Sequence, residues 1–480
     1  MTSPVILWFR FDLRIADNAA VDAAARSGRP VIPVYILDDD SPGEWRLGAA
    51  SRWWLAGSLE ALSASLARLG SRLVLRHGEA GRALASVIAE TGATEVVCNR
   101  VHEPWAVARD ERIAAALAAR AITFRAFESQ LLFPPEAMPG PRRVGYRVFT
   151  AFWKAALASP APAAPIPVPT GFSAPDPWPA SEPLGDWSLC PTAPDWAGGL
   201  RDAWTPGEEG ARERLTHFLN QGIEAYATAR DRPDLSGTSR LSPHLRFGEI
   251  GPRQVWHAVT ARAAAENREA AGAPFLRQLL WREFSYNLLN RFPQLPEEPL
   301  QRGFGRFPWR GDEGALAAWR RGRTGYPMVD AAMRELWATG WMHNRARMIV
   351  ASFLVKHLLQ PWHTGAGWFW DTLVDADLAN NAASWQWVAG CGADAAPYFR
   401  IFNPVLQGEK FDPDGAYVRR WVPELAGLPS ALIHRPWTAT PLALADAGVR
   451  LGHTYPRPIV DHAFARSRAL AALASIKNGR

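Results

Sequence analysis

The stretch EVVCNRVHEPWAVARDERIAAALAARAITFRAF, residues 95–127, alternates between two kinds of pattern. EVVC (95–98) and ITFRAF (122–127) are short β-rich runs, whereas AVARDERIAAALAAR (106–120) between them has a helical pattern. Strands that alternate with helices are typical of a doubly wound parallel sheet.

The same alternation extends back to the N-terminus, where the further β-rich runs are VILWF (5–9), VIPVYIL (31–37) and RLVLR (72–76). We therefore predict an α/β fold in which residues 1–130 form a doubly wound parallel-sheet domain. No GxGxxG follows the first strand, so a dinucleotide site of the Rossmann kind is not expected there. A nucleotide cofactor, if one binds, is expected elsewhere in the chain.

The middle of the chain is rich in proline, which recurs every few residues between Pro160 and Pro194. This composition resists helices and favours extended segments, so we predict an interdomain linker over residues 131–200. From residue 201 to residue 480 apolar residues recur at helical spacings and no strand series is evident. The second domain is therefore predicted to be all-helical.

The length of 480 residues also favours two domains over one. The longest apolar stretch with a helical pattern, Ile349 to Val355, is far shorter than the ~20 residues that span a bilayer. Arg10 and Asp12 interrupt the N-terminal segment too early for a secretory signal peptide. A cytoplasmic protein without a membrane span is expected.

The charged and sulfur-containing residues exclude some classes of site. The three cysteines, Cys98, Cys190 and Cys391, lie far apart, so neither a disulfide framework nor a metal site is expected. The net charge of +6 comes mostly from arginine, which suits phosphate recognition. Codon bias explains the arginines equally well, so charge alone leaves the function open.

Three motifs in the predicted helical domain combine polar or charged residues in patterns that are typical of binding sites. In DRPDLSGTSRLSPHL (231–245), Ser242 before Pro243 is typical of a helix N-terminus that either is simply capped or binds a phosphate. In FLRQLLWREF (275–284), an amide, an indole and a guanidinium share one helix face, as on a recognition surface. In WMHNRARM (341–348), Arg347 could pair with an aspartate of DADLANNAASWQW (375–387), either around a polar ring system or as a structural salt bridge.

Read together and in order, these motifs resemble the photolyase and cryptochrome family, in particular bacterial cyclobutane pyrimidine dimer photolyases. The resemblance runs nearly end to end and is weakest in the proline-rich linker. The stretches that carry it are LWFRFDLRIADNAAV (7–21), GTSRLS (237–242), WREF (281–284), TGYPMVDAAMRELWATGWMHNRARM (324–348), ASFLVK (351–356), DADLANNAASWQW (375–387) and DAAPYFRIFNP (394–404).

The resemblance implies light-driven DNA repair by a carbon–carbon lyase with FAD in the helical domain. Excited reduced FAD would pass one electron to the dimer, the cyclobutane ring would split, and the electron would return. The residues implied to hold the phosphates and ribityl chain of FAD are Tyr226, Thr238, Ser239, Arg240, Leu241 and Ser242. Those implied beside its isoalloxazine ring are Phe275, Arg347, Asp375, Asp377 and Asn381, the last facing flavin N5.

The family also implies an electron route and a DNA face. The resemblance assigns the family's electron-transfer chain to Trp385, Trp362 and Trp309. Tryptophan suits this role because indole is easily oxidised. Trp281 and Trp387 would flank a flipped pyrimidine dimer. The other positions implied to contact the lesion or its phosphates in UV-damaged DNA are Arg230, Gln278, Arg282, Asn344, Arg345, Met348, Arg400 and Gln407.

Two departures from the family pattern leave alternatives open. Gln278 stands where many dimer photolyases have glutamate and resembles the (6-4) photolyase choice. Asn344 and Met348 replace the histidine pair that (6-4) chemistry needs, so the cyclobutane dimer is favoured over a (6-4) lesion.

A blue-light signalling cryptochrome is the main rival, and the absence of a long C-terminal tail favours repair. A dark flavin oxidoreductase would need a nicotinamide fingerprint, which the sequence lacks.

The antenna chromophore is less defined than FAD. Glu103 is retained, but Trp105 and Ala106 stand where some folate-binding relatives have an Asn-Glu pair. Methenyltetrahydrofolate in an altered pose and a deazaflavin both stay open. The protein is expected to act as a monomer.

Overall fold

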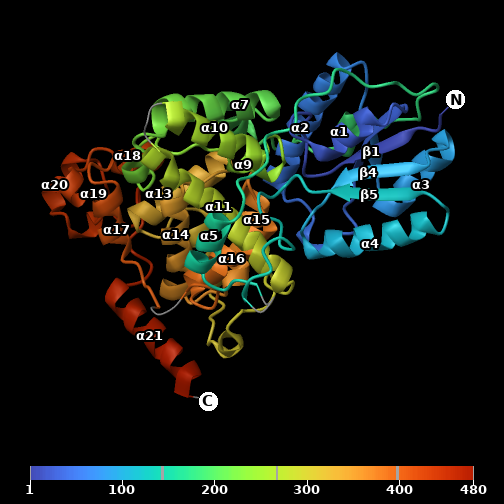
Figure 1. Cartoon of the computed structure of the whole chain (residues 1–480). Coiled ribbons are helices and arrows are strands. Elements are labelled where there is room, and N and C mark those ends of the chain that lie inside the picture. The colour runs from blue at the N-terminus through green and yellow to red at the C-terminus, as the bar shows by residue number, and fades with distance from the viewer. Residues whose placement is uncertain (1, 142–144, 266–268, 396–398, 479–480) are drawn as a thin grey trace. The chain divides into compact units, whose positions relative to one another are not determined.

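The computed structural model describes residues 2–141, 145–265, 269–395 and 399–478 (Figure 1). The chain forms two compact units, each assembled from separate segments. Unit 1 comprises residues 1–223, 239–293 and 374–379, and unit 2 comprises residues 224–238, 294–373 and 380–480. These units are defined by contacts, so the domain boundaries at residues 130 and 200 stay a prediction.

Unit 1 contains a five-stranded parallel sheet of order β3-β2-β1-β4-β5 (Figure 1). The strands are β1 (Val5–Phe9), β2 (Val31–Leu37), β3 (Val74–His77), β4 (Glu95–Asn99) and β5 (Thr123–Phe127). In register, Val5 of the central strand lies opposite Val31 on one side and Glu95 on the other. The prediction of an N-terminal doubly wound parallel sheet is confirmed.

Helices cover both faces of this sheet, which explains why its strands are continuous apolar runs. The helices between the strands are α1 (Ala19–Arg26), α2 (Ala49–Arg68), α3 (Ala80–Thr91) and α4 (Pro104–Ala118). All of β1 is buried. Apolar residues of α3 and α4, among them Leu84 and Ile113, form one core cluster with Ile6, Val34 and Val96 of the sheet.

The remainder of unit 1 is helical or extended. Its further helices are α5 (Phe149–Ala158), α6 (Gly198–Ala203), α7 (Glu208–His217), α9 (Ser242–Arg246), α10 (Pro252–Ala265) and α11 (Glu269–Arg291). Residues 160–183, where proline is frequent, form no helix. Proline has no backbone N–H to donate, so this segment stays extended.

Unit 2 consists of helices, and no named strand lies beyond residue 127 in the described part of the chain. Its helices are α8 (Tyr226–Ala229), α12 (Glu313–Arg320), α13 (Pro327–Thr339), α14 (Asn344–Ser352), α15 (Trp362–Thr372), most of α16 (Leu378–Ala389), α17 (Pro404–Phe411), α18 (Ala416–Trp421), α19 (Ser430–Ile433), α20 (Pro441–Asp446) and α21 (His462–Asn478). The prediction of an all-helical second half is confirmed. None of the described helices has the length and apolar character of a membrane span.

Candidate flavin and DNA site

In unit 1 a buried tyrosine fixes one of the predicted flavin carboxylates. The hydroxyl of Tyr286 in α11 donates to Oδ2 of Asp377 at 2.5 Å. Burial, together with the negative charge of Asp377, raises the pKa of Tyr286 well above its usual value, so this hydroxyl stays protonated as a donor. Asp375 and Asp377 are both buried, at 8% and 6% exposure. Their pairing with Arg347 stays a prediction.

The predicted phosphate loop has an unusual backbone. Arg240 has φ +51°, a left-handed conformation that is uncommon outside glycine. Its guanidinium lies 4.4 Å from the ring centroid of Trp204. The backbone N–H of Leu241 donates to the hydroxyl of Ser239 at 3.4 Å. The loop is thus held in a tight turn, with Leu241 buried, Thr238 and Ser239 half-buried and Ser242 exposed.

The interpretation of Ser242 as a helix N-cap is wrong. Helix α9 begins at Ser242, and the capping position is Leu241, which provides no side-chain capping bond. The reason is that Leu241 already has helical dihedrals, φ −84° and ψ −5°, so the helix starts one residue earlier than the Ser-Pro pattern indicates. The five-residue helix leaves the phosphate role of this loop as a prediction.

Helix α11 presents Gln278 and Trp281 as half-buried side chains. The indole of Trp281 stacks on the ring of Phe149, with centroids 3.7 Å apart and planes 8° from parallel. One face of Trp281 is therefore covered within unit 1. Phe275, earlier on the same helix, is buried and lies 4.6 Å from the ring of Phe218.

Arg282 is turned inward. Its Nη1 donates to the carbonyl of Gln130 at 3.0 Å and to Oε1 of Glu283 at 3.1 Å, and the residue is 9% exposed. Burial raises the pKa of Glu283 to about 7, although the neighbouring guanidinium opposes this shift. These bonds tie α11 to residue 130, and a phosphate contact by Arg282 stays a prediction.

A pocket that is partly open to solvent lies in unit 1 at the carboxyl ends of β1, β2 and β4. In the strand order, β1 is flanked by β2 and β4, so this is the point where the sheet reverses its direction of growth and where open α/β sheets bind ligands. Its walls carry aromatic rings, guanidiniums and carboxylates, including those of Tyr35, Asp38, Trp45, Trp105 and Arg109.

The carboxylate of Glu103, which matches the folate-binding relatives, makes its polar contacts with other residues of unit 1. Its carboxylate pairs with Nη1 of the buried Arg246 at 2.6 Å and accepts from the indole N–H of Trp105 at 2.8 Å. Ala106 is buried in the first turn of α4. Glu103 therefore orients Trp105, whose ring lies 5.1 Å from the guanidinium of Arg109.

In unit 2, Asn381 and Trp385 lie one turn apart on α16 and both contact α15. The carboxamide N–H of Asn381 donates to the carbonyl of Ala366 at 3.0 Å. The indole of Trp385 is 2% exposed and meets the ring of Phe369 edge-on, with centroids 5.0 Å apart at 69°. The amide predicted to face flavin N5 and the first indole of the electron route are thus fixed by one helix.

The segments that carry Trp362 and Trp309 are joined by two hydrogen bonds. The N–H of Arg310 donates to the carbonyl of Leu359 at 2.7 Å, and the side chain of Gln360 donates to the carbonyl of Asp312 at 2.8 Å. Trp362 is 1% exposed, whereas Trp309 is only half-buried and packs 4.4 Å from the ring of Phe307. The series therefore runs from buried to partly exposed indoles.

Helix α14 begins with the predicted lesion-contact residues. Asn344 is exposed, and its amide lies 4.0 Å from the sulfur of Met348. The preceding histidine, His343, is 2% exposed and accepts the N–H of Arg345, and burial lowers its pKa to about 4. It acts as a neutral cap of α14.

The predicted arginines of unit 2 differ in their partners. Arg345 pairs with Asp231 at 2.8 Å, and the guanidinium of Arg347 donates to the carbonyl of Met342 at 2.8 Å. Arg230 is half-buried, with its guanidinium 6.0 Å from the ring of Tyr226. The half-buried Gln407 lies on α17, and the half-buried Thr238 ends a segment of unit 2.

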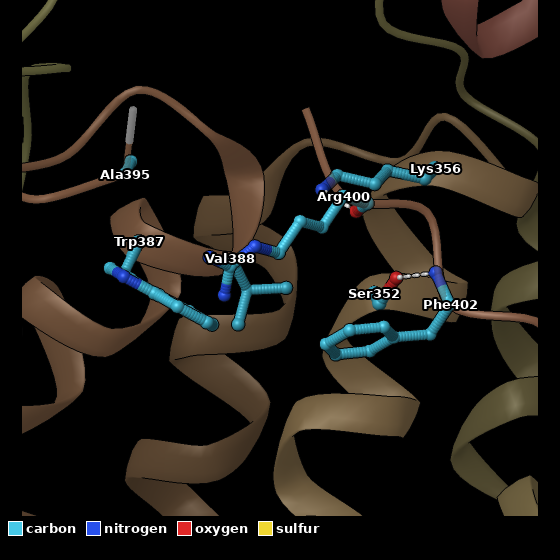
Figure 2. Close-up of a pocket in the computed structure, with 7 residues that line it drawn as sticks. All are labelled: Ser352, Lys356, Trp387, Val388, Ala395, Arg400 and Phe402. Carbon is cyan, nitrogen blue, oxygen red and sulfur yellow. Dashed lines mark hydrogen bonds between the residues drawn. The ribbon is translucent and has the colours of Figure 1, made fainter. Parts of the chain in front are cut away.

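Arg400 and Trp387 line a small pocket in unit 2. Figure 2 shows the side chain of Arg400 reaching across this pocket towards Trp387, and its guanidinium lies 5.5 Å from the indole centroid. At the other end the ammonium of Lys356 donates to the carbonyl of Arg400. Burial, with the nearby charge of Arg400, lowers the pKa of Lys356 to about 7. The two predicted DNA-contact residues are thus brought together.

Several residues that hold this site in place were not predicted from the sequence. Tyr286 follows Arg282 by four positions, so helical spacing could have indicated that both residues lie on the same face of α11. Phe149, Lys356 and the carbonyl of Ala366 gave no local signal, because their contacts join distant parts of the sequence.

Comparison with known proteins gives the class. The family model described as "DNA photolyase" matches residues 5–170, and the family model described as "FAD binding domain of DNA photolyase" matches residues 275–475. The chain is 53% identical to the deoxyribodipyrimidine photo-lyase of Agrobacterium fabrum, over 99% of this chain and 98% of the relative. The chain belongs to the photolyase and cryptochrome family, which confirms the resemblance seen in its motifs.

Other relatives show how widely the family extends around this chain. It is 40% identical to cryptochrome-1 of Arabidopsis thaliana, over 98% of this chain and 70% of that relative. The crystal structure of a bacterial class III photolyase from Agrobacterium tumefaciens superposes with a TM-score of 0.95 at 52% identity, covering 100% of this chain and 98% of the other. The chain is therefore closely similar to DNA photolyases along its whole length.

Proposed function

We propose that this protein is a light-driven DNA-repair enzyme that splits cyclobutane pyrimidine dimers with FAD as its cofactor. The observation that carries the proposal is the pairing of Asn381 and Trp385 on one turn of α16, both fixed against the helix that Trp362 begins. An amide suited to a flavin ring and an indole suited to electron supply are thus placed together. A cytoplasmic location and a monomeric state belong to the same proposal.

The chemistry of the donor set fits FAD. The phosphates and ribityl hydroxyls of FAD need hydroxyls and guanidiniums, which Thr238, Ser239 and Ser242 with Arg240 would provide. The polar edge of a flavin needs groups that accept and donate hydrogen bonds, which Asp375, Asp377 and Asn381 would provide. Bound FAD would supply light absorption and one-electron transfer.

The aromatic residues of the DNA face support base recognition by stacking. Trp281 already has one face covered by Phe149, so we propose that its other face receives an extruded pyrimidine. Trp387 is also proposed to stack on a pyrimidine, with Arg400 adding charge for a phosphate. Both contacts help offset the free energy lost when a dimer leaves the stack.

The cyclobutane dimer is favoured over the (6-4) lesion by the state of the residues near Asn344. Repair of a (6-4) lesion needs a histidine that transfers a proton, and Met348 stands at one of the two expected positions. The adjacent His343 is buried and neutral and already caps α14, so it offers no exposed acid. Gln278 keeps hydrogen bonding to a pyrimidine dimer without adding charge.

We also propose that the pocket at the sheet reversal binds the second, light-harvesting chromophore. Its mixture of aromatic walls and charged groups suits a flat conjugated ring with polar substituents, as in methenyltetrahydrofolate or a deazaflavin. Mass analysis of the chromophores released from purified protein would identify it. A W105A variant should lose this chromophore and keep FAD; loss of neither would place the antenna elsewhere.

Light-dependent repair is the test of the main proposal. Reduced, FAD-loaded protein is mixed with a thymine-dimer oligonucleotide, and thymine absorbance is followed under illumination and in darkness. We expect restoration only in the light. A signalling cryptochrome, the second candidate supported by the 40% identity to a plant cryptochrome, would photoreduce its flavin but restore no absorbance.

A further inference from the structure

Helix α15 (Trp362–Thr372) carries two glycines, Gly365 and Gly367, in its first two turns. Glycine within a helix is less favourable than alanine, because it loses more backbone freedom on folding. Each glycine therefore lowers the stability of α15, unless a larger side chain would not fit at its position.

The surroundings of the two glycines differ. A Cβ atom on Gly365 would lie 2.1 Å from Cη2 and 2.5 Å from Cζ3 of Trp385, and 2.6 Å from a methyl carbon of Leu354. No atom lies within 4 Å of a Cβ placed on Gly367. Carbon atoms in contact are about 3.5–4.0 Å apart, so only Gly365 is required for a close approach.

The indole of Trp385 has little room to move away. It is 2% exposed and meets Phe369 edge-on, and Phe369 in turn stacks on Trp319 with centroids 6.3 Å apart. The indole N–H of Trp319 donates to the carbonyl of Val350 at 3.0 Å, which fixes this second ring. A side chain at position 365 would therefore displace the indole of Trp385 from α15 or distort the helix.

Gly365 lies next to both buried indoles of the predicted electron-transfer chain, Trp385 and Trp362. Trp362 precedes it by three residues, so both lie on one face of α15. The outer ring of Trp385 thus rests on the backbone one turn from Trp362. Because electron tunnelling slows steeply as the gap between donor and acceptor widens, the depth at which this indole packs controls how fast it can be refilled.

We propose that Gly365 is a positioning residue for photoreduction, which lets Trp385 pack onto α15 within electron-transfer reach of Trp362. The inference rests on the proposed function. One electron leaves the Trp385 indole for the photoexcited oxidised flavin, and the resulting indole radical takes one electron from Trp362. Trp362 is refilled through Trp309, which takes its electron from an added thiol. No atom other than a compensating solvent proton is exchanged.

The first experiment compares G365A with the matched control G367A, a change of the same kind in the same helix. Oxidised FAD-loaded proteins are illuminated with a thiol, and loss of the oxidised-flavin absorption is timed. We expect photoreduction of G365A to be severalfold slower than that of the wild type, because the gap between the two indoles widens. G367A should match the wild type. FAD content and repair by chemically reduced protein should be unchanged in both variants.

The second experiment measures packing without light. W385F removes the Cη2 and Cζ3 atoms that a Cβ at position 365 would strike. G365A should therefore lower the melting temperature with tryptophan at position 385 and lower it much less in the W385F background, a clear non-additivity. A G365A single variant that fails to accumulate, beside a G365A/W385F variant that accumulates normally, would support the same conclusion.

Three results would overturn the proposal. G365A could photoreduce as fast as G367A while the wild type is active, which refutes the positioning role alone. Equal losses of melting temperature in both backgrounds, or failure of both variants to accumulate, would refute the contact with Trp385. If the wild type itself does not photoreduce, the proposed function fails first, and the redox role of Gly365 with it.

Discussion

The carboxamide of Asn381 donates a hydrogen bond to the backbone carbonyl of Ala366 at 3.0 Å, from α16 to α15. Only the NH₂ group of the amide can donate to a carbonyl, so this bond fixes which end of the side chain faces α15. The partner at this position must be a donor. An ionised carboxylate, which only accepts, cannot replace it.

Asn381→Asp should therefore destabilise the protein by about 1–3 kcal/mol at pH 8, because a carboxylate would face the Ala366 carbonyl. That carbonyl would raise the folded-state pKa of the new carboxyl group. Stability is then present at low pH, where the protonated group donates, and is lost as pH rises through the raised pKa. Thermal unfolding at pH 5 and pH 8 measures the difference. Ser384→Asp, an exposed change on the same helix, is the control, and equal losses at both pH values would contradict the account.

Trp385→Phe should abolish most light-driven reduction of the bound flavin, because phenylalanine is much harder to oxidise than indole. Repair by chemically reduced protein should stay within about twofold, since this route is then bypassed. Trp337→Phe, at a position that is 62% exposed, is the control. Loss of both photoreduction and chemically initiated repair in W385F would refute a separate role for this indole.

The fold was largely predictable because the strands carry a strong local signal. VILWF and VIPVYIL coincide with β1 and β2, since strands buried on both faces are continuous apolar runs. Helical spacing likewise indicated the second half. The start of α9 was misplaced by one residue, because the left-handed turn at Arg240 determines where that helix begins.

The candidate site was predictable only in part. The roles of Asn381 and Trp385 were predicted from the family resemblance, but their partners on α15 depend on how two helices pack. The inward bonds of Arg282 were equally hidden, since the spacing that places it beside Trp281 gives no information about the carbonyl of Gln130.

Arg400→Ala and Arg282→Ala should separate DNA binding from stability. Arg400 is exposed beside Trp387, so its loss should weaken binding to damaged DNA and reduce the salt dependence by about one phosphate contact. Loss of Arg282 leaves the buried Glu283 without its ion-pair partner and should cost roughly 3 kcal/mol of unfolding free energy. Binding titrations at several salt concentrations and chemical denaturation measure the two effects. An unchanged salt slope for R400A would remove Arg400 from the DNA face.

Acidification should loosen the C-terminal helix α21. His357 is fully buried and lies 2.8 Å from His462 of α21, and burial lowers its pKa to about 3. A histidine with a lowered folded-state pKa contributes stability above its unfolded value of about 6.5, and this is lost as pH falls below that value. Hydrogen exchange of α21, corrected for the intrinsic pH dependence of amide exchange, should therefore increase from pH 7 to pH 5. His462→Gln, which keeps a hydrogen-bonding group without titrating, should reduce this increase, and exchange that is independent of pH would contradict the account.

The central claim is that an electron from light-excited, reduced FAD splits a cyclobutane dimer held at this site. The most direct measurement compares repair of matched oligonucleotides that carry one cyclobutane thymine dimer or one (6-4) photoproduct, each in light and in darkness, by the reduced FAD-loaded protein. The account predicts that only the cyclobutane dimer is restored, and only in the light. Restoration of the (6-4) photoproduct alone, or of neither lesion under illumination, would contradict it.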